Sequence, residues 1–227
     1  MYINTSGIVL REVTYKDSSK ILTILTSSEG KLTVSAHGAH RKNSKLAAVT
    51  QLLVFSEMTL SQKKDRWTLS EAQSIEQFIG LRDDLKLLAL GAYIAELTET
   101  VADEDSPNPE LLPLCLNSLY ALSEKLKAPE YVKPAFELRL MSISGFRPIL
   151  TETKNENAAM THEEGTLMLG AQALGAAGYI LHCDAKKLFS FKLSPAALRE
   201  LSIVTESYML THLDRTFKTL DYYHRIM

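Results

Sequence analysis

The sequence contains only two cysteines, Cys115 and Cys183, among its 227 residues. A disulfide framework cannot be built from so few thiols. The chain also lacks an apolar run of about 18 residues, which a membrane-spanning helix needs. Its polar N-terminus has neither the charged nor the apolar segment of a signal peptide. We therefore expect a cytoplasmic protein that makes no membrane contact.

Familiar enzyme motifs are missing as well. There is no Gly-x-x-x-x-Gly-Lys-Ser/Thr phosphate loop, no Gly-x-Ser-x-Gly elbow and no His-Glu-x-x-His motif. One alternative is a metal-dependent nuclease that uses Asp103, Asp105 and a histidine. Three consecutive acids, however, cannot all point into one site from a helix end, so a solvated loop is the better interpretation. We expect no catalysis and no cofactor.

Charge is distributed unevenly along the chain, although its net value is only −2. Residues 1–80 carry ten Lys or Arg against seven Asp or Glu, whereas residues 81–150 carry seven against eleven. Residues 151–227 are nearly balanced, with eight against nine. A basic first third favours an anionic ligand for that part of the chain. Ordinary scatter of surface charge explains the same counts about as well.

Short runs rich in β-branched residues dominate this first third. Apolar positions recur in them at nearly every second residue, which is typical of half-buried strands. Glu29-Gly30 suits a tight hairpin turn, because glycine accepts a positive φ. Short strands without βαβ spacing predict a small closed barrel, for which the five-stranded OB-fold is the obvious candidate. The expected strands are residues 7–11, 20–26, 31–37, 51–61 and 66–72.

From about residue 75 the apolar periodicity becomes helical. Pro129 is placed to open one helix, and Gly145 to follow its C-terminus. Ser194-Pro195 forms a good N-cap and N1 pair for a short helix. The expected helices are residues 85–101, 110–126, 129–143, 194–201 and 205–213.

These patterns predict an α+β fold in which an N-terminal OB-fold barrel precedes a helical domain. We place the barrel at residues 1–78 and the helical domain at residues 79–227. An irregular insertion is expected at about residues 150–192. Within it, the apolar residues 179–181 and 188–191 are expected to pair as a hairpin.

Cations gather in a loop and in a charged turn of the predicted barrel. Mobile cations beside a rigid platform suit contacts to phosphates, and nearby aromatic rings can stack on bases. Tyr15 and Trp67 are the aromatic candidates, but Trp67 lies in an alternating strand and is better explained as core. For the cations alone, a solvated surface is the commoner explanation. The candidate DNA-binding residues are Arg11, Lys20, Lys31, Arg41, Lys42, Lys45, Lys63, Lys64, Arg66, Arg215 and Lys218.

The order of the N-terminal elements resembles the RecO family of bacterial recombination mediators. The matching segments are Gly7 to Leu10, Ile21 to Thr26, Glu29 to Lys31 and Ala36 to Ser44, with His40 as an extra residue. Near the C-terminus, residues 212–220 resemble the C-terminal motif of the same family. If this segment is helical, Arg215 and Lys218 are neighbours on the helix surface, because they are three residues apart.

The resemblance implies a DNA-binding adaptor in repair and recombination rather than an enzyme. By this resemblance, the barrel would bind single- and double-stranded DNA and the partner RecR. The helical domain would bind the tail of the single-stranded-DNA-binding protein, which helps to load RecA. Strand annealing would follow from holding two polyanions close together. The localisation implied is the bacterial cytoplasm, at the nucleoid. An RNA- or oligosaccharide-binding barrel is a further alternative.

The sequence departs from the family where many members carry two Cys-x-x-Cys pairs. Four thiolates at that spacing form a tetrahedral structural zinc site. Here the first pair falls near Thr153 and Glu156, and in the second only Cys183 matches, with Lys186 in the other place. His162 and His182 are poor substitutes, so we expect no metal.

We predict that the chain folds without zinc, because other residues occupy three of the four expected thiol positions. Elemental analysis of the purified protein measures the metal content directly. Stoichiometric zinc that is lost when Cys183 is mutated would contradict the prediction.

Overall fold

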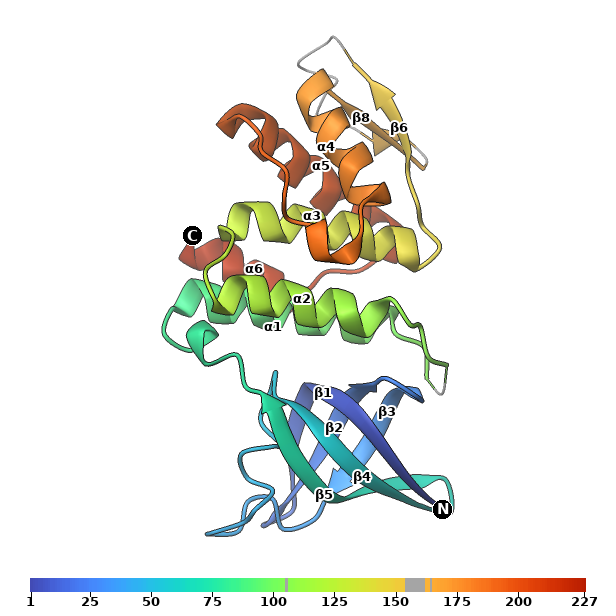
Figure 1. Ribbon diagram of the computed structural model, residues 1–227, viewed down its shortest axis with the longest axis vertical. Helices are drawn as coiled ribbons and strands as arrows, with labels where there is room; N and C mark the ends of the chain where they lie inside the picture. Colours follow the sequence, from blue (N-terminus) through green and yellow to red (C-terminus); the bar gives the residue numbers. More distant parts are fainter. Residues whose placement is uncertain (105, 154–161, 164) are drawn as a thin grey trace. The chain divides into compact units, whose positions relative to one another are not determined.

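The computed structural model describes residues 1–104, 106–153, 162, 163 and 165–227 (Figure 1). The chain forms two compact units. One unit comprises Met1–Leu112 with Tyr222–Met227, and the other comprises Pro113–Asp221. The predicted domain division between residues 78 and 79 stays a prediction, since compactness groups the first long helix with the barrel.

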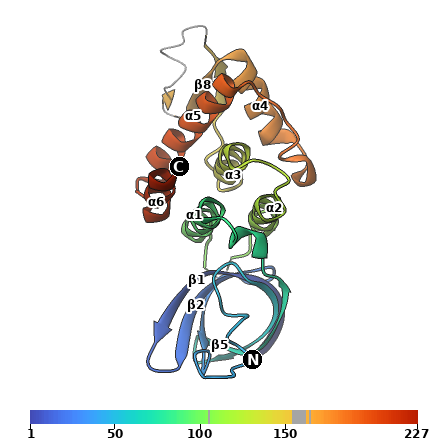
Figure 2. The same ribbon diagram turned by 90° about the vertical axis from the view of Figure 1, so that its left-hand side faces the viewer.

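The first unit is built on a closed five-stranded barrel with the strand order β1-β2-β3-β5-β4. Figure 2 shows the closed ring of strands. Neighbouring strands are antiparallel except for β3 and β5, which pair in parallel through Val34 and Trp67. The predicted OB-fold barrel is therefore confirmed. Its strands are β1 (Tyr2–Tyr15), β2 (Ser19–Thr26), β3 (Gly30–Ala36), β4 (Phe55–Lys63) and β5 (Arg66–Glu76).

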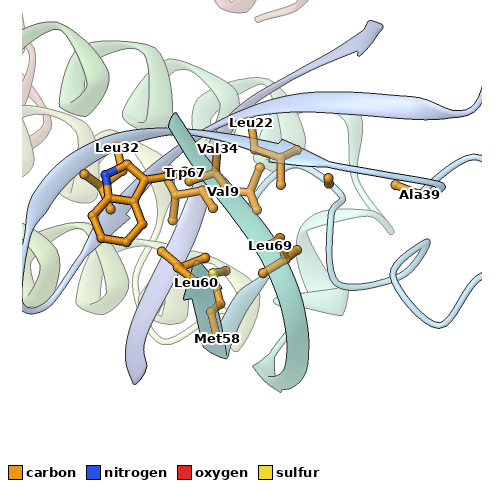
Figure 3. Close-up of a cluster of buried hydrophobic side chains, with 11 residues drawn as sticks. Val9, Leu22, Leu32, Val34, Ala39, Met58, Leu60, Trp67 and Leu69 are labelled. Atoms are coloured by element: carbon orange, nitrogen blue, oxygen red, sulfur yellow. The ribbon is translucent and has the colours of Figure 1, made fainter. Parts of the chain in front are cut away.

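Alternation along the strands fills the barrel interior. In β3, for example, Leu32 and Val34 are buried while Thr33 between them is exposed. Trp67 is 8% exposed and belongs to the apolar cluster in the barrel (Figure 3). Trp67 is thus a core residue, as its alternating strand predicts, and its ring is not available to stack on a base.

Two helical elements follow the barrel within the first unit: η1 (Ile79–Leu81) and α1 (Leu85–Val101). Asp84 is the N-cap of α1, and its side chain accepts a hydrogen bond of 2.8 Å from the backbone N–H of Lys86. The chain beyond α1 returns to the barrel at Gly30. A Cβ atom on Gly30 would lie 2.6 Å from the carbonyl oxygen of Ser106, so glycine is required at this turn.

The second unit is mostly helical. Within it, α3 packs against α4 and α5. A small sheet with the order β6-β8-β7 lies in the predicted insertion and adds strands to this otherwise helical part. The helices from α2 onwards are α2 (Leu111–Ser123), α3 (Pro129–Ile143), α4 (Ala171–His182), η2 (Ala185–Lys187), α5 (Pro195–Leu213) and α6 (Lys218–Ile226). The small strands are β6 (Ile149–Glu152), β7 (His162–Glu163) and β8 (Thr166–Leu169).

Two expectations for the C-terminal half are wrong, and one helix there was not predicted. The two helices expected at residues 194–201 and 205–213 form the single helix α5, because residues 202–204 contain no glycine or proline. Residues 179–181 lie in α4 and not in a hairpin strand. Two glycines in α4 lower its helix propensity, which hides a helical repeat of buried alanines. Helix α6 was not expected at all.

A buried ion network joins α3 to α5. The Nζ atom of Lys133 lies 2.7 Å from Oε1 of Glu137 and 2.6 Å from Oε2 of Glu206. Glu137 also accepts a hydrogen bond of 3.1 Å from the hydroxyl of Thr205. Burial lowers the pKa of Lys133, but the two carboxylates outweigh that effect, so the pKa is raised. Lys133 therefore stays charged at neutral pH.

We predict that Lys133→Met lowers the free energy of unfolding by about 3–5 kcal/mol, because it leaves Glu137 charged, buried and short of its cation. Urea denaturation of the variant and the parent protein measures this difference. Lys86→Met, at an exposed position of α1, is the control and should change stability by less than about 0.5 kcal/mol. Equal losses in the two variants would contradict the role of the network.

Candidate nucleic-acid interface

The loop after β3 folds back onto the β1–β2 hairpin. The backbone N–H of His40 donates to the carbonyl oxygen of Ser18 at 3.1 Å, and Nε2 of His40 lies 3.0 Å from the hydroxyl of Thr14. A turn follows, in which the N–H of Arg41 donates to Gly38 at 3.0 Å. These contacts place cations of the loop and of the hairpin at one end of the barrel. The exposed residues Tyr15, Lys16, Arg41, Lys42 and Lys45 are called the barrel tip below.

A buried lysine anchors this arrangement. Lys20 is 7% exposed, and its Nζ atom pairs with Oε2 of Glu12 and lies 3.4 Å from the carbonyl oxygen of Thr50. The other carboxylate oxygen of Glu12 accepts a hydrogen bond of 3.1 Å from the N–H of Leu52. One ion pair thus joins β1 and β2 to the far end of the loop. Lys20 is consequently a structural residue, and its charge is matched within the chain.

Tyr15 is the exposed aromatic residue of the barrel tip. Its side chain is 49% exposed, and Nζ of Lys16 lies 5.3 Å from the centre of its ring. A ring beside a cation can stack on a base while the cation contacts the adjoining phosphate. Lys16 was missed among the candidates from the sequence. Its position in a polar turn, directly after an aromatic residue, is the sequence signal that could have identified it as a candidate.

The β4–β5 hairpin carries the second group of cations, Lys63, Lys64 and Arg66, all of which are exposed. In Figure 1 this hairpin lies beside the N-terminus, whereas the loop after β3 lies at the opposite side of the barrel. The two groups are therefore separate. Both border β3, however, because β5 begins beside Val34 and the loop begins where β3 ends.

Two further candidates, Arg11 and Lys31, hold α1 to the barrel. Nε of Arg11 lies 2.8 Å from a carboxylate oxygen of Glu99. Nζ of Lys31 donates to the backbone carbonyl of Glu99 at 3.1 Å, and its N–H donates to Asp103 at 3.2 Å. These contacts use both side chains within the first unit, and we leave them out of the interface proposed below.

Arg215 and Lys218 would be neighbours only within one helix, and no single helix contains both residues. Asp214 has a positive φ and ends α5, so Arg215 lies in the connection before α6. The Arg215 guanidinium lies 5.3 Å from the centre of the Phe217 ring. Lys218 is exposed and is the first residue of α6.

A groove of about 720 Å³ is lined by residues of β1, β4 and β5 together with Ser27. Its charged lining residues are Glu57 and Glu71, and the rest are small, hydroxyl-bearing or amide side chains together with Met58. Two carboxylates without a cation repel phosphate, so this face does not suit nucleic acid. The lining also includes no aromatic ring on which a base could stack.

The residues beside Cys183 do not fit a metal ion. The Arg139 guanidinium lies 3.6 Å from Sγ of Cys183, and the Arg147 guanidinium lies 2.5 Å from Nε2 of His182. Nδ1 of the same histidine is 2.8 Å from the carbonyl oxygen of Gly178. Both ring nitrogens are therefore engaged, and two guanidinium cations oppose a further positive charge.

The described part of the chain contains no group of three or more His, Cys, Asp or Glu side chains that could hold a metal ion. Asp105 and Glu156 lie outside the described residues, as does the side chain of His162. Nor does any helix within the described residues have the length and apolar character needed to span a membrane.

Comparison with known proteins gives a consistent result over nearly the whole chain. Residues 1–78 match the family model for the Recombination protein O N terminal, and residues 82–221 match that for the Recombination protein O C terminal. The chain is 33% identical to the DNA repair protein RecO of Acetivibrio thermocellus, with 97% of this chain and 96% of that protein covered. It is 31% identical to the protein of the same name from Caldicellulosiruptor bescii, with 99% and 98% covered. A similar protein from Bacillus subtilis is 31% identical, with 89% and 77% covered. The chain belongs to the Recombination protein O family.

Proposed function

We propose that this chain is a non-enzymatic DNA-repair mediator that binds the backbone of single-stranded DNA at the barrel tip. The observation that carries the proposal is the docking of the loop onto the β1–β2 hairpin. It brings the loop that carries Arg41, Lys42 and Lys45 against the hairpin that carries Tyr15 and Lys16. Cations on a rigid support, with an aromatic ring among them, bind single strands without reading their sequence.

Strand β3 offers a path from the barrel tip to the second group of cations. Thr33 is exposed on this strand and His37 just beyond its end, while Leu32, Val34 and Ala36 are buried. A strand of DNA laid over β3 would meet Arg41 at one end and Arg66 at its side. Double-stranded DNA would use the same cations, because phosphate contacts carry no base information.

The proposed partners are those that the resemblance to the RecO family implies. We propose that the barrel also binds RecR, that the helical part binds the tail of the single-stranded-DNA-binding protein, and that these contacts help to load RecA. The setting is the bacterial cytoplasm. Neither a catalytic step nor a metal is needed, because the work consists of holding polyanions and screening their repulsion. Mg²⁺-dependent cleavage of DNA by the purified protein would favour the nuclease alternative instead.

A binder of oligosaccharide would use the groove over β1, β4 and β5, whose hydroxyl and carboxylate groups suit a sugar better than a phosphate. RNA would use the barrel tip. Competition between single-stranded DNA, RNA and neutral oligosaccharides for the protein separates these alternatives from the proposed function.

We predict that Arg41→Ala combined with Lys42→Ala weakens binding of single-stranded DNA about equally for all sequences. Each phosphate contact contributes about 0.7 to the slope of log affinity against log salt on single strands, so the slope should fall by about 1.4. Fluorescence anisotropy at several salt concentrations measures both quantities. Thermal stability should hardly change, because the two side chains are exposed.

The matched control is Lys86→Ala with Arg199→Ala, which removes two exposed cations outside the barrel tip. Its salt slope should equal that of the parent protein. An unchanged slope in the Arg41 and Lys42 variant would refute the assignment and move the DNA site toward Arg215 and Lys218.

We predict that Tyr15→Ala weakens binding of single strands by about 1–3 kcal/mol, the usual contribution of one stacked base. Duplex DNA keeps its bases stacked, so its affinity should stay nearly unchanged. The salt slope should also stay unchanged, because no charge is removed. Tyr15→Phe retains the ring and should bind single strands like the parent protein. Equal losses on single and double strands would show that Tyr15 only supports the hairpin.

A further inference from the structure

A further group of lysines, apart from those of the barrel, lies in the helical unit where the chain runs from η2 to α5. Lys186, Lys187 and Lys192 are exposed there, and the half-buried Lys127 lies two residues before the start of α3. We infer that these four residues, the lysine cluster, bind the phosphate backbone of a second single strand. The inference rests on the proposed function, because it concerns a strand bound in addition to the one at the barrel tip.

The segment that carries the lysine cluster is held firmly, although it has no regular secondary structure after η2. Three side chains donate hydrogen bonds to its backbone carbonyl groups, so exposed cations are presented from a fixed support. The three bonds are Lys127 Nζ to Phe191 at 2.9 Å, the Tyr131 hydroxyl to Leu193 at 3.2 Å and the Tyr179 hydroxyl to Lys187 at 2.8 Å.

Aromatic rings form the base of this support. The ring of Phe191 is 5.4 Å from that of Tyr131 and 6.5 Å from that of Tyr179, measured between centroids. Phe191 is only 7% exposed. Nζ of Lys127 lies 4.3 Å over the ring of Tyr131. The rings are therefore used within the unit, and the cations remain as the groups that face a ligand.

Positive charge in the cluster is not neutralised by its neighbours. Burial and the nearby charge of Lys192 lower the pKa of Lys127. Among the described residues, no carboxylate is paired with a lysine of the cluster. The flanking acids in the sequence are Glu124, Glu130 and Asp184. A bound anion would relieve the repulsion between Lys127 and Lys192.

The chemistry favours phosphates over an acidic peptide. A peptide that binds tightly needs an apolar anchor pocket in addition to charge. Here Phe191 is buried and the two tyrosine hydroxyls are bonded to the backbone, so the aromatic rings are already engaged. Lysine acts as a point charge that contacts a phosphate without a preformed pocket.

The test counts the short oligonucleotides that bind to each chain. Under tight-binding conditions at low salt, the parent protein should bind two oligothymidines of about 10 nucleotides, a length within the usual range for one site. Lys187→Gln with Lys192→Gln should bind one, and its rate of annealing complementary strands should fall at least about tenfold. Lys127 is left unchanged because it supports Phe191.

Lys86→Gln with Arg199→Gln is the matched control and should still bind two oligonucleotides. The Arg41 and Lys42 variant reports on the barrel tip alone. A failure of the proposed function at the barrel tip can therefore be distinguished from a failure of the inference about the lysine cluster. Two oligonucleotides on the Lys187 and Lys192 variant, with annealing unchanged, would overturn the inference. It would also be overturned if a poly-glutamate peptide bound in a manner that depends on these lysines while the oligonucleotide count stayed at two, because the cluster would then serve an acidic protein.

Discussion

The ion pair between the buried Lys20 and the partly buried Glu12 is the interaction on which the proposed interface depends. It has partners on both sides, because Glu12 also accepts the N–H of Leu52 and Lys20 also reaches the carbonyl of Thr50. A desolvated pair is costly unless further hydrogen bonds satisfy both ions, and here the loop supplies them. The loop can therefore lie against the hairpin only in an arrangement that completes this network. The network thereby fixes the position of the long loop between β3 and β4, which carries Arg41, Lys42 and Lys45.

The same pair shows what the sequence could and could not predict. Alternating apolar residues determine the barrel, since a strand with one buried face has only one register that suits it. Trp67 could be placed in the core on this basis. A lysine within a strand gives no comparable signal. Lys20, Lys31 and Arg11 were all candidates for DNA, yet their partners are up to 88 residues away in sequence. Glu12 and Lys20 meet within one hairpin, whereas only the folded unit brings Arg11 and Lys31 to Glu99.

The helical part was harder to predict for a related reason. Helices α1 and α3 have clear start signals in Asp84 and Pro129, and both were found. Helix α4 buries small residues such as Ala173 and Ala177, whose weak hydrophobicity barely marks a periodicity. Its stability depends on packing against α3 and α5 and not on its own sequence. The Lys133 network is similar, since its partner Glu206 is 73 residues further along the chain.

Once the matched charges are removed, the remaining cations form a simple pattern. Lys20, Arg11, Lys31 and Lys133 have partners within their own units, and the groove over β1, β4 and β5 carries carboxylates. The cations outside these pairs include those at the barrel tip, at the β4–β5 hairpin and in the lysine cluster. A net charge of −2 is thus compatible with the proposed binding of polyanions, because cations outnumber acids within the barrel tip and the β4–β5 hairpin. Two strands of DNA repel each other in free solution because both carry negative phosphates. A protein that binds each at its own basic surface lowers that repulsion without covalent chemistry, which is what bringing complementary strands together requires.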